Sequence, residues 1–318
     1  MDAFFEMLQN VAMFVALAIP GFVLVKSKLI KSSDTGILSK LLSYVALPFF
    51  VLYSTLKIDF TGEMTASILL LGGIGIVFTF ALYLLAILFT RNETQQRKRG
   101  ILQFCMIFSN SGFLGLPLAE EVFGTIEPTA KTFLIVLNII NNIYMYTLGV
   151  YMVTGDKKQM NVKKALLNPV LIAFLAGIIF NLTKAAVYVP EIADYTGKIG
   201  NIVTPLSMTI LGAKMADVKF AKIFTSKTMY FASAFKLVLS PILAIALMLL
   251  LRFILPINNA MILAFFVGFC TPSATLAATF SDQYDVDADT AVVSTLGSTL
   301  LSIASISLLY WGLSAILF

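Results

Sequence analysis

Two polar motifs that contain glycine or proline lie in the middle of apolar stretches of the sequence. The first is residues 110–117 (NSGFLGLP) within the stretch 101–123, and the second is residues 270–275 (CTPSAT) within 261–281. Glycine and proline interrupt a helix, and lipid cannot satisfy the backbone N–H and C=O groups that are freed in this way. Each motif therefore predicts a helix that is broken inside a membrane and lines protein or a wet cavity.

The chemistry expected at such breaks is anion binding. The second half of a broken helix begins with unpaired N–H groups and carries about half a unit of positive charge at that end. Two such ends that face each other attract an anion without a buried arginine. The residues expected at this binding site are Asn110, Ser111, Gly112, Gly115, Pro117, Thr271, Pro272, Ser273 and Thr275. For each polar side chain, the alternative is a structural role in helix packing or in stabilising the exposed backbone.

Three amides, Asn138, Asn141 and Asn142, lie within one apolar stretch, residues 132–153. Their spacing places Asn138 on the same helix face as the other two. A polar face is costly in lipid, so we expect it to point into the protein. These amides either line the substrate cavity or join two helices by hydrogen bonds.

Four ionisable residues are candidates for ion coupling or for a counter-ion: Lys236, Glu120, Glu121 and Asp282. Lys236 lies well inside an apolar stretch, where an ionisable group indicates function by default, although a lysine stem can also reach the interface. The three acids closely follow the two motifs. They form either a cation or proton relay or ordinary solvated helix ends.

The composition is that of an integral membrane protein. Of 318 residues, 59% are hydrophobic and 12% are charged, and the mean hydropathy is +0.92. Soluble domains of this length are far less apolar, so we expect a multi-pass protein of the cell (inner) membrane, embedded in the lipid bilayer. The net charge of +5 needs no nucleic acid, because the basic residues lie in short loops beside spans.

The residue types also restrict the reaction chemistry. The chain has no histidine, and its two cysteines lie inside expected spans, where we interpret them as buried apolar thiols. We therefore expect neither a metal site nor a cofactor. The acids lie at span ends, so the catalytic constellations of an intramembrane enzyme are missing, and we expect no enzyme.

The hydropathy predicts ten spans in an all-α fold. Their approximate bounds are 8–25, 36–55, 64–90, 101–123, 132–153, 166–186, 192–215, 227–252, 261–281 and 288–318. The longest polar interruption between spans, residues 154–164, is expected to be a cytoplasmic linker. It separates a first five-helix repeat, residues 1–153, from a second, residues 165–318.

The two halves are expected to be inverted repeats. Pro48 and Pro205 lie 157 residues apart in similar spans, as do Lys57 and Lys214. Because each half has an odd number of spans, the second half enters the membrane from the opposite side. Most lysines and arginines lie on one side of the predicted topology, and the positive-inside rule then places both termini outside.

Residues 110–117, Leu47-Pro48 and Leu239-Ser240-Pro241 resemble the auxin efflux carrier family, which includes plant PIN-type carriers and bacterial malate or malonate permeases. The resemblance covers nearly the whole chain. It implies two inverted five-helix repeats, similar to bile-acid symporters and sodium/proton antiporters, with broken helices four and nine crossing at the substrate site. It also implies elevator-like movement of a transport domain against a scaffold domain.

The chain departs from the plant members in two places. In those members an asparagine beside each crossing contacts the substrate carboxylate; Asn110 matches the first, whereas the second crossing here has Thr271-Pro272. The chain also lacks the long cytoplasmic loop of many plant carriers. It therefore resembles a bacterial member.

Two functional hypotheses remain. The first is a secondary transporter that moves a small organic anion, a mono- or dicarboxylate, by elevator-type alternating access with proton or sodium coupling left open. The second is a ligand-sensing or channel-like membrane protein that uses the same fold without coupled transport. A receptor is expected to carry a signalling domain, and the non-apolar stretches here are short, so we favour the transporter. The oligomeric state stays open, a homodimer included.

Overall fold

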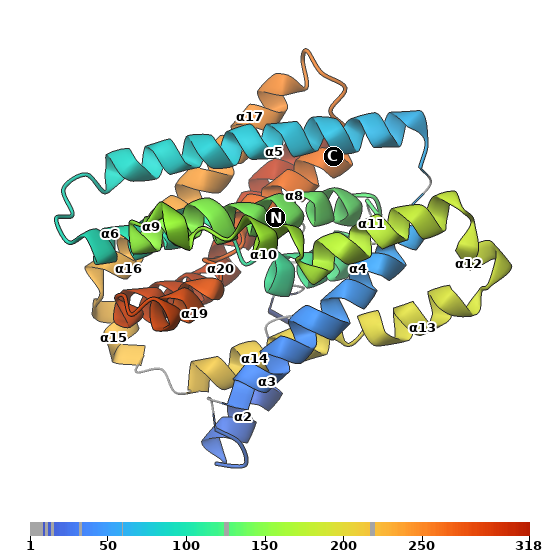
Figure 1. The fold of residues 1–318 in the computed structure, drawn as a ribbon. Coiled ribbons are helices and arrows are strands. Elements are labelled where there is room, and N and C mark those ends of the chain that lie inside the picture. Colours follow the sequence, from blue (N-terminus) through green and yellow to red (C-terminus); the bar gives the residue numbers. More distant parts are fainter. Residues whose placement is uncertain are drawn as a thin grey trace.

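The computed structural model of the chain is all-helical (Figure 1). It describes residues 9, 12–13, 16–31, 34–58, 60–123, 127–216 and 220–318. The expected first span falls partly outside these residues, and its second half forms α2 (Ile19–Lys26). Within the described ranges, the one pairing of strand type is an isolated antiparallel bridge between Ser109 and Ser273.

Five helices of the described chain are long and apolar enough to cross a membrane. They are Thr35–Leu56, Gly62–Phe89, Ala130–Thr154, Lys227–Leu251 and Ala288–Leu317. A helix needs about 20 apolar residues to span the hydrocarbon core, so length and composition allow each of them to cross it. Each agrees within a few residues with an expected span, which confirms the prediction of an all-helical, multi-pass membrane protein.

Three of these spans consist of several consecutive elements. The first contains α3 (Thr35–Leu41), η2 (Leu42–Ala46) and α4 (Leu47–Leu56); the third contains α8 (Ala130–Tyr144), η4 (Met145–Gly149) and α9 (Val150–Thr154); the fourth contains α16 (Lys227–Ala234), η6 (Phe235–Leu239) and α17 (Ser240–Leu251). The other two are the single helices α5 (Gly62–Phe89) and α20 (Ala288–Leu317).

Three π-helical segments end two residues before a proline. They are η2 before Pro48, η3 (Ser111–Gly115) before Pro117, and η6 before Pro241. Proline has no N–H, and in an α-helix its ring collides with the carbonyl four residues earlier, so a wider turn relieves the collision. These prolines therefore determine where the three helices widen.

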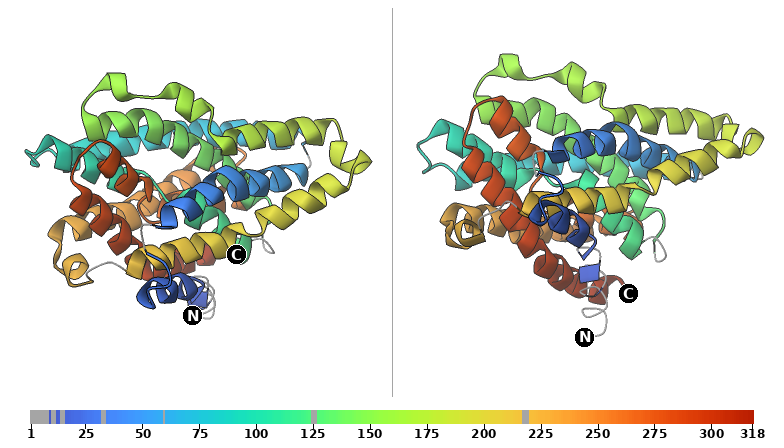
Figure 2. Two further views of the ribbon diagram at one scale, coloured as in Figure 1. Left: turned by 60° about the horizontal axis from the view of Figure 1, so that its bottom comes forward. Right: turned by 90° about the horizontal axis from the view of Figure 1, so that it is seen from below.

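One set of helices, which we call the α4 group, packs together at one side of the molecule. It contains α2, α3, η2, α4, α11 (Pro169–Leu182), α13 (Glu191–Gly200) and α14 (Val203–Ala216). In Figure 1 the blue helices α2 to α4 lie beside the yellow helices α13 and α14, and Figure 2 shows the same neighbours from two other directions. The expected seventh span is interrupted by a turn between α13 and α14.

The second set, which we call the crossover group, contains both broken helices. Its members are α5, α6 (Gln96–Ile107), η3, α7 (Leu116–Phe123), α8, η4, α9, α16, η6, α17, α18 (Asn259–Cys270), α19 (Leu276–Gln283) and α20. Aromatic side chains join its helices: the Phe78 ring on α5 lies 5.3 Å from Phe265 and 4.7 Å from Phe269 on α18. Short helices connect the elements: η5 (Lys157–Gln159), α10 (Val162–Leu166), α12 (Ala185–Tyr188) and α15 (Phe220–Thr225).

Candidate functional site

The two broken helices cross each other at their breaks. Between α6 and η3 the chain is extended, and it runs antiparallel to the break between α18 and α19. The backbone N–H of Asn110 donates to the Pro272 carbonyl at 2.8 Å, and the N–H of Ala274 donates to the Phe108 carbonyl at 2.9 Å. Each break therefore satisfies part of the backbone that the other exposes, as the absence of water in a membrane requires.

The first break lies earlier in the chain than the motif suggested. It covers Phe108 to Asn110, and Pro117 is the second residue of α7, which continues directly from η3. Pro272 lies within the second break, as expected. The difference arises because η3 absorbs the effect of Pro117 inside the helix, so the chain becomes helical again before it reaches the proline.

Buried side chains fix the crossing from within the crossover group. The Ser273 hydroxyl donates to the Cys105 carbonyl at 2.7 Å, and the Ser273 N–H donates to the Ser298 hydroxyl at 3.1 Å. Lys236, which is fully buried, donates to the Ile107 carbonyl at 3.1 Å and also to the Ser109 hydroxyl. Its ammonium thus lies at the C-terminus of α6, where the helix dipole favours a positive charge.

A cavity of about 560 Å³ lies beside the crossing, between the two groups of helices. The α4 group contributes Thr35, Gly36, Ser39, Lys40, Ser43, Tyr44, Leu47, Asn168, Pro169, Val170 and Lys214. The crossover group contributes Ser109, Asn110, Gly112, Phe113, Asn138, Asn142, Met145, Tyr146, Ala274, Thr275, Leu276 and Thr279. Among the residues that the structure describes, the lining of this cavity contains two lysines and no aspartate or glutamate, so the charges described there are positive.

Asn110 joins the crossing to the cavity. Its carbonyl accepts from the N–H groups of Leu114 and Gly115, both at 3.1 Å, which starts the second half-helix. The N–H groups of residues 111–113 have no carbonyl partner within that helix. Two of these residues, Gly112 and Phe113, line the cavity. The Asn110 side chain makes no capping hydrogen bond. Its amide is therefore available to a ligand in the cavity.

Two of the three asparagines of α8, Asn138 and Asn141, bond to the start of η3 or to the break before it, and two of the three, Asn138 and Asn142, reach the cavity. Asn138 donates to the Ser111 hydroxyl at 2.9 Å, and Asn141 donates to the Ser109 carbonyl at 2.9 Å. Asn142 donates to the Asn138 carbonyl at 2.8 Å. Asn138 and Asn142 line the cavity, whereas Asn141 is absent from its lining. Both readings of these amides, helix joining and cavity lining, therefore apply.

The comparison with known proteins concerns nearly the whole of the chain. Residues 6–310 match the family described as Membrane transport protein. The chain belongs to this transporter family. The transporter is also 25% identical over 303 residues to a protein described as an uncharacterized transporter from Methanothermobacter thermautotrophicus (strain Delta H), a match that covers 94% of this chain and 96% of that protein. The resemblance to auxin efflux carriers is thereby confirmed, and so is the expectation of a transporter in place of an enzyme.

Several motif residues lie around the crossing and outside the cavity lining: Ser111, Gly115, Thr271 and Ser273. Ser111 and Ser273 make the hydrogen bonds given above, and Gly115 faces Thr271 across the crossing. The Thr271 hydroxyl is fully buried and has no hydrogen-bond partner among the described residues. Of the second motif, Ala274 and Thr275 line the cavity.

Two of the acidic candidates of the transporter, Glu120 and Glu121, are outside the lining of this cavity. Glu120 on α7 forms an ion pair with Lys131 at the start of α8, and Glu121 is exposed. Asp282 belongs to α19, but its side chain is outside the part of the chain that the structure describes. Among the described residues, no group of three or more His, Cys, Asp or Glu side chains is placed to hold a metal ion.

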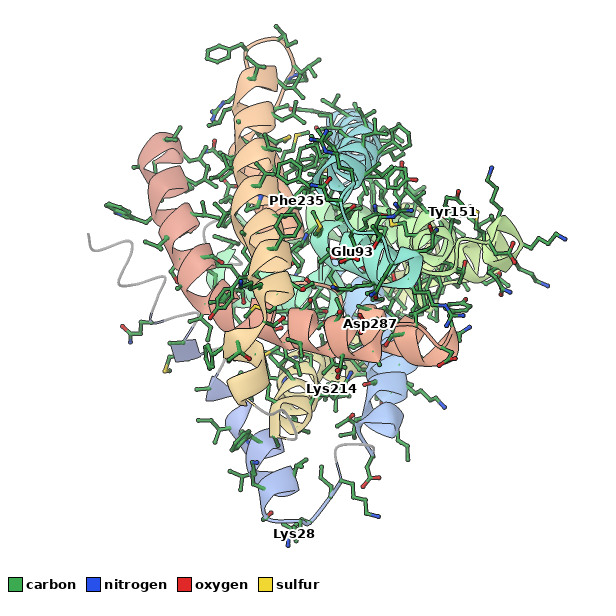
Figure 3. The ribbon with its side chains drawn as sticks, turned by 90° about the vertical axis from the view of Figure 1, so that its left-hand side faces the viewer. Lys28, Glu93, Tyr151, Lys214, Phe235 and Asp287 are labelled. Carbon is green, nitrogen blue, oxygen red and sulfur yellow. The ribbon has the colours of Figure 1, made fainter. Side chains whose placement is uncertain are left out.

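Several lining residues of the transporter were not expected from the sequence. The most informative is Lys214, which lies on α14 inside the outline of the molecule in Figure 3, whereas Lys28 lies at the tip of an outer loop. Lys214 falls at the end of an expected span, so its position did not distinguish it from a loop lysine. The polar face of the second span, with Thr35, Ser39 and Ser43 at spacings of four residues, was a usable signal for a cavity wall.

Proposed function

We propose that this transporter carries a small organic anion, a mono- or dicarboxylate, across the cell membrane. The observation that carries the proposal is the Asn110 amide at the start of a half-helix, which makes no capping hydrogen bond and faces a cavity whose described lining holds lysines and no acids. An amide offers two donors and an acceptor, and unpaired helix N–H groups favour a negative charge. A carboxylate satisfies both, because it accepts several hydrogen bonds at once.

Both half-helices contribute to the proposed site. The first half-helix, formed by η3 and then α7, begins at Ser111. The second, α19, begins at Leu276, which itself lines the cavity. Two helix N-termini that converge on one cavity add their partial positive charges, and each is worth about 0.3–1 kcal/mol toward an anion at an exposed site and up to about 2 kcal/mol in a partly buried one. Thr275 adds a hydroxyl on the α19 side. The anion is thus bound largely by the crossover group.

The cavity lies between two groups of helices, which supports alternating access by movement of one group against the other. In this proposal the crossover group is the transport domain and the α4 group is the scaffold. Helix pairing is consistent with inverted repeats at residues 1–153 and 165–318: α2 packs on α14, and α11 packs on α4. These pairs correspond if the first and second spans of one repeat match those of the other.

Lys236 places a buried, ionisable amino group at the crossing in this mechanism. Its amino group donates to the Ile107 carbonyl and the Ser109 hydroxyl. In its absence, these two oxygen atoms could bind a coupling cation. A buried ammonium next to the anion site lowers the free energy of the bound anion through Coulomb attraction, which is stronger in a membrane interior than in water. Lys236 is therefore the first residue to examine for proton coupling, ahead of Glu120 and Glu121.

We place the mouth of the cavity on the side of the loops that join α2 to α3 and α9 to α11, because Gly36 in the first turn of α3 and Asn168 at the N-cap of α11 line it. These loops are rich in lysine, so the positive-inside rule places them in the cytoplasm. The proposed conformation is therefore open to the cytoplasm, with both termini outside.

The test is a thermal-shift screen of the purified transporter against mono- and dicarboxylates, with and without sodium and at two pH values. A ligand that binds the folded state raises the midpoint as its concentration exceeds the Kd. We expect carboxylates to stabilise the wild type and Asn110→Ala to weaken their binding about ten- to a hundredfold, the effect of losing a hydrogen bond of roughly 1.5–3 kcal/mol to a charged group.

The matched control is Asn92→Ala, because Asn92 is exposed in the loop after α5. This variant should bind as the wild type does. If no carboxylate stabilises the wild type, the proposed function is wrong. If Asn110→Ala keeps wild-type affinity, Asn110 is not part of the site.

A further inference from the structure

Lys214 is a half-buried cation with no acidic partner in the part of the chain that the structure describes. It lies near the C-terminal end of α14 (Figure 3). It also lines the cavity. Among the described residues, the ion pairs are Lys98 with Glu93 and Lys131 with Glu120, and neither involves Lys214. Removing an ammonium partly from water without a counter-charge is unfavourable, so a partly buried, unpaired lysine in a cavity indicates an anionic ligand.

Lys214 lines the cavity from the α4 group, on α14, which itself packs against η3. Asn110 and the half-helix N-termini belong to the crossover group, whereas Lys214 belongs to the α4 group. The other lysine of the lining, Lys40, is exposed at the start of the second span and keeps its contact with water. The cavity therefore has two separate places for negative charge, one on each group of helices.

We propose that Lys214 binds a second acidic group of the substrate and makes the transporter prefer dicarboxylates to monocarboxylates. This inference rests on the proposed function, because the first carboxylate is the one bound at Asn110. A dicarboxylate bridges the two groups of helices, with one carboxylate at the half-helix N-termini and the other at the Lys214 ammonium. A monocarboxylate of equal chain length places a methyl group there and leaves the ammonium unpaired.

The same geometry gives Lys214 a role in specificity that a helix dipole cannot supply. Helix N-termini attract any anion, so the crossing alone distinguishes poorly between one and two carboxylates. A point charge on α14 interacts with the second carboxylate alone. Selectivity between the two classes of acid is then a difference in affinity, which one residue of α14 controls.

The experiment measures Kd by isothermal titration calorimetry for pairs of acids of equal carbon number: malonate with propionate, succinate with butyrate, and glutarate with valerate. We expect at least one dicarboxylate to bind the wild type at least tenfold more tightly than its partner. Lys214→Met should weaken that dicarboxylate about ten- to a hundredfold, as expected for a lost charged contact, and change the monocarboxylate less than threefold.

Two further variants separate charge from packing. Lys214→Arg keeps the cation and should keep the dicarboxylate preference. Lys198→Met removes one positive charge from α13, where Lys198 is exposed near the Tyr195 ring and outside the cavity lining, and should bind both acids as the wild type does. The melting midpoint without ligand, measured for each variant, identifies one that fails to fold, and Lys214→Arg then decides the matter.

The inference is overturned if the wild type binds both members of every pair equally, or if Lys214→Met weakens both classes of acid to the same extent. It is also overturned if Lys198→Met reproduces the loss. In each of these results the proposed function survives, because a carboxylate still binds. The absence of binding by any of the six acids contradicts the proposed function itself.

Discussion

Ser273 illustrates how single residues hold the crossing together. Its hydroxyl donates to the carbonyl of Cys105 at 2.7 Å, and both groups are buried. That carbonyl lies in the last turn of α6, which ends at Ile107. The N–H four residues later is therefore outside the helix and cannot bond to it as a helical N–H would. Ser273 therefore replaces a hydrogen bond that the break removes.

We predict that Ser273→Ala lowers the stability of the ligand-free transporter. The Cys105 carbonyl loses its partner while it stays buried, which costs about 1–3 kcal/mol. The melting midpoint in detergent should fall relative to Ser314→Ala, since the Ser314 hydroxyl is exposed and bonds only to Trp311 in its own helix. Equal midpoints for the two variants would show that the Ser273 bond contributes nothing to the crossing.

The two motifs could be recognised in the sequence, but which of their residues line the cavity and which bond to other helices could not be predicted. Asn110 and Thr275 line the cavity, whereas Ser111 and Ser273 bond to other helices. In the sequence all four are small polar residues at a helix break, so they look alike. Which way each side chain points depends on the second broken helix, 161 residues away, and local pattern carries no information about that contact.

At the scale of elements, helix packing depends on close backbone approach. α2 and α14 touch at Gly21 and Gly212, each of which lies against the backbone of the other helix. A Cβ at Gly212 would lie 2.9 Å from the backbone nitrogen of Phe22 and closer still to the Ala18 carbonyl. Membrane helices associate through such small residues, because lipid gives no hydrophobic drive between them.

We predict that Gly212→Ala destabilises the transporter. The new methyl group collides with backbone that cannot rotate away, so α2 and α14 must separate, at about 1–3 kcal/mol. Gly73→Ala is the matched control, because Gly73 is exposed on α5 and a Cβ there meets nothing within 4 Å. It should leave the melting midpoint unchanged or raise it, since alanine favours a helix over glycine by up to about 1 kcal/mol. A Gly212→Ala midpoint equal to that of Gly73→Ala would contradict the close contact.

The sequence predicted the helices of the transporter better than it predicted the contacts of single side chains. Hydropathy predicted the five long spans within a few residues, because a stretch of apolar residues long enough to cross lipid is a strong local signal. The place of the first break was less well predicted, since it depends on π-helical widening before Pro117 and on pairing with the second break. The turn that divides α13 from α14 had no clear signal in the apolar run.

At the scale of the whole molecule, the cavity is a property of both groups of helices. Seven of its lining residues lie on the second span, from Thr35 to Leu47, and belong to the α4 group. The proposed movement of one group against the other would change this wall and leave the crossing intact, because the hydrogen bonds at the crossing lie within the crossover group. The sequence repeat suggested two halves, but each half contributes helices to both groups.

The measurement that tests the central claim most directly is carboxylate exchange in proteoliposomes made with Ser43→Cys. Ser43 lines the cavity on the α4 group, and the two native cysteines are fully buried, so maleimide should react at position 43 alone. The assay uses the labelled form of the acid that raises the melting midpoint most. Ser314→Cys, outside the cavity, is the control.

If the cavity is the binding site for transport, maleimide should abolish exchange by Ser43→Cys, and the same acid at saturating concentration should slow the labelling. Exchange by the maleimide-treated Ser314→Cys should match that of the untreated protein. Undiminished exchange by fully labelled Ser43→Cys would contradict the account, because the anion would then cross without passing the cavity beside the crossing.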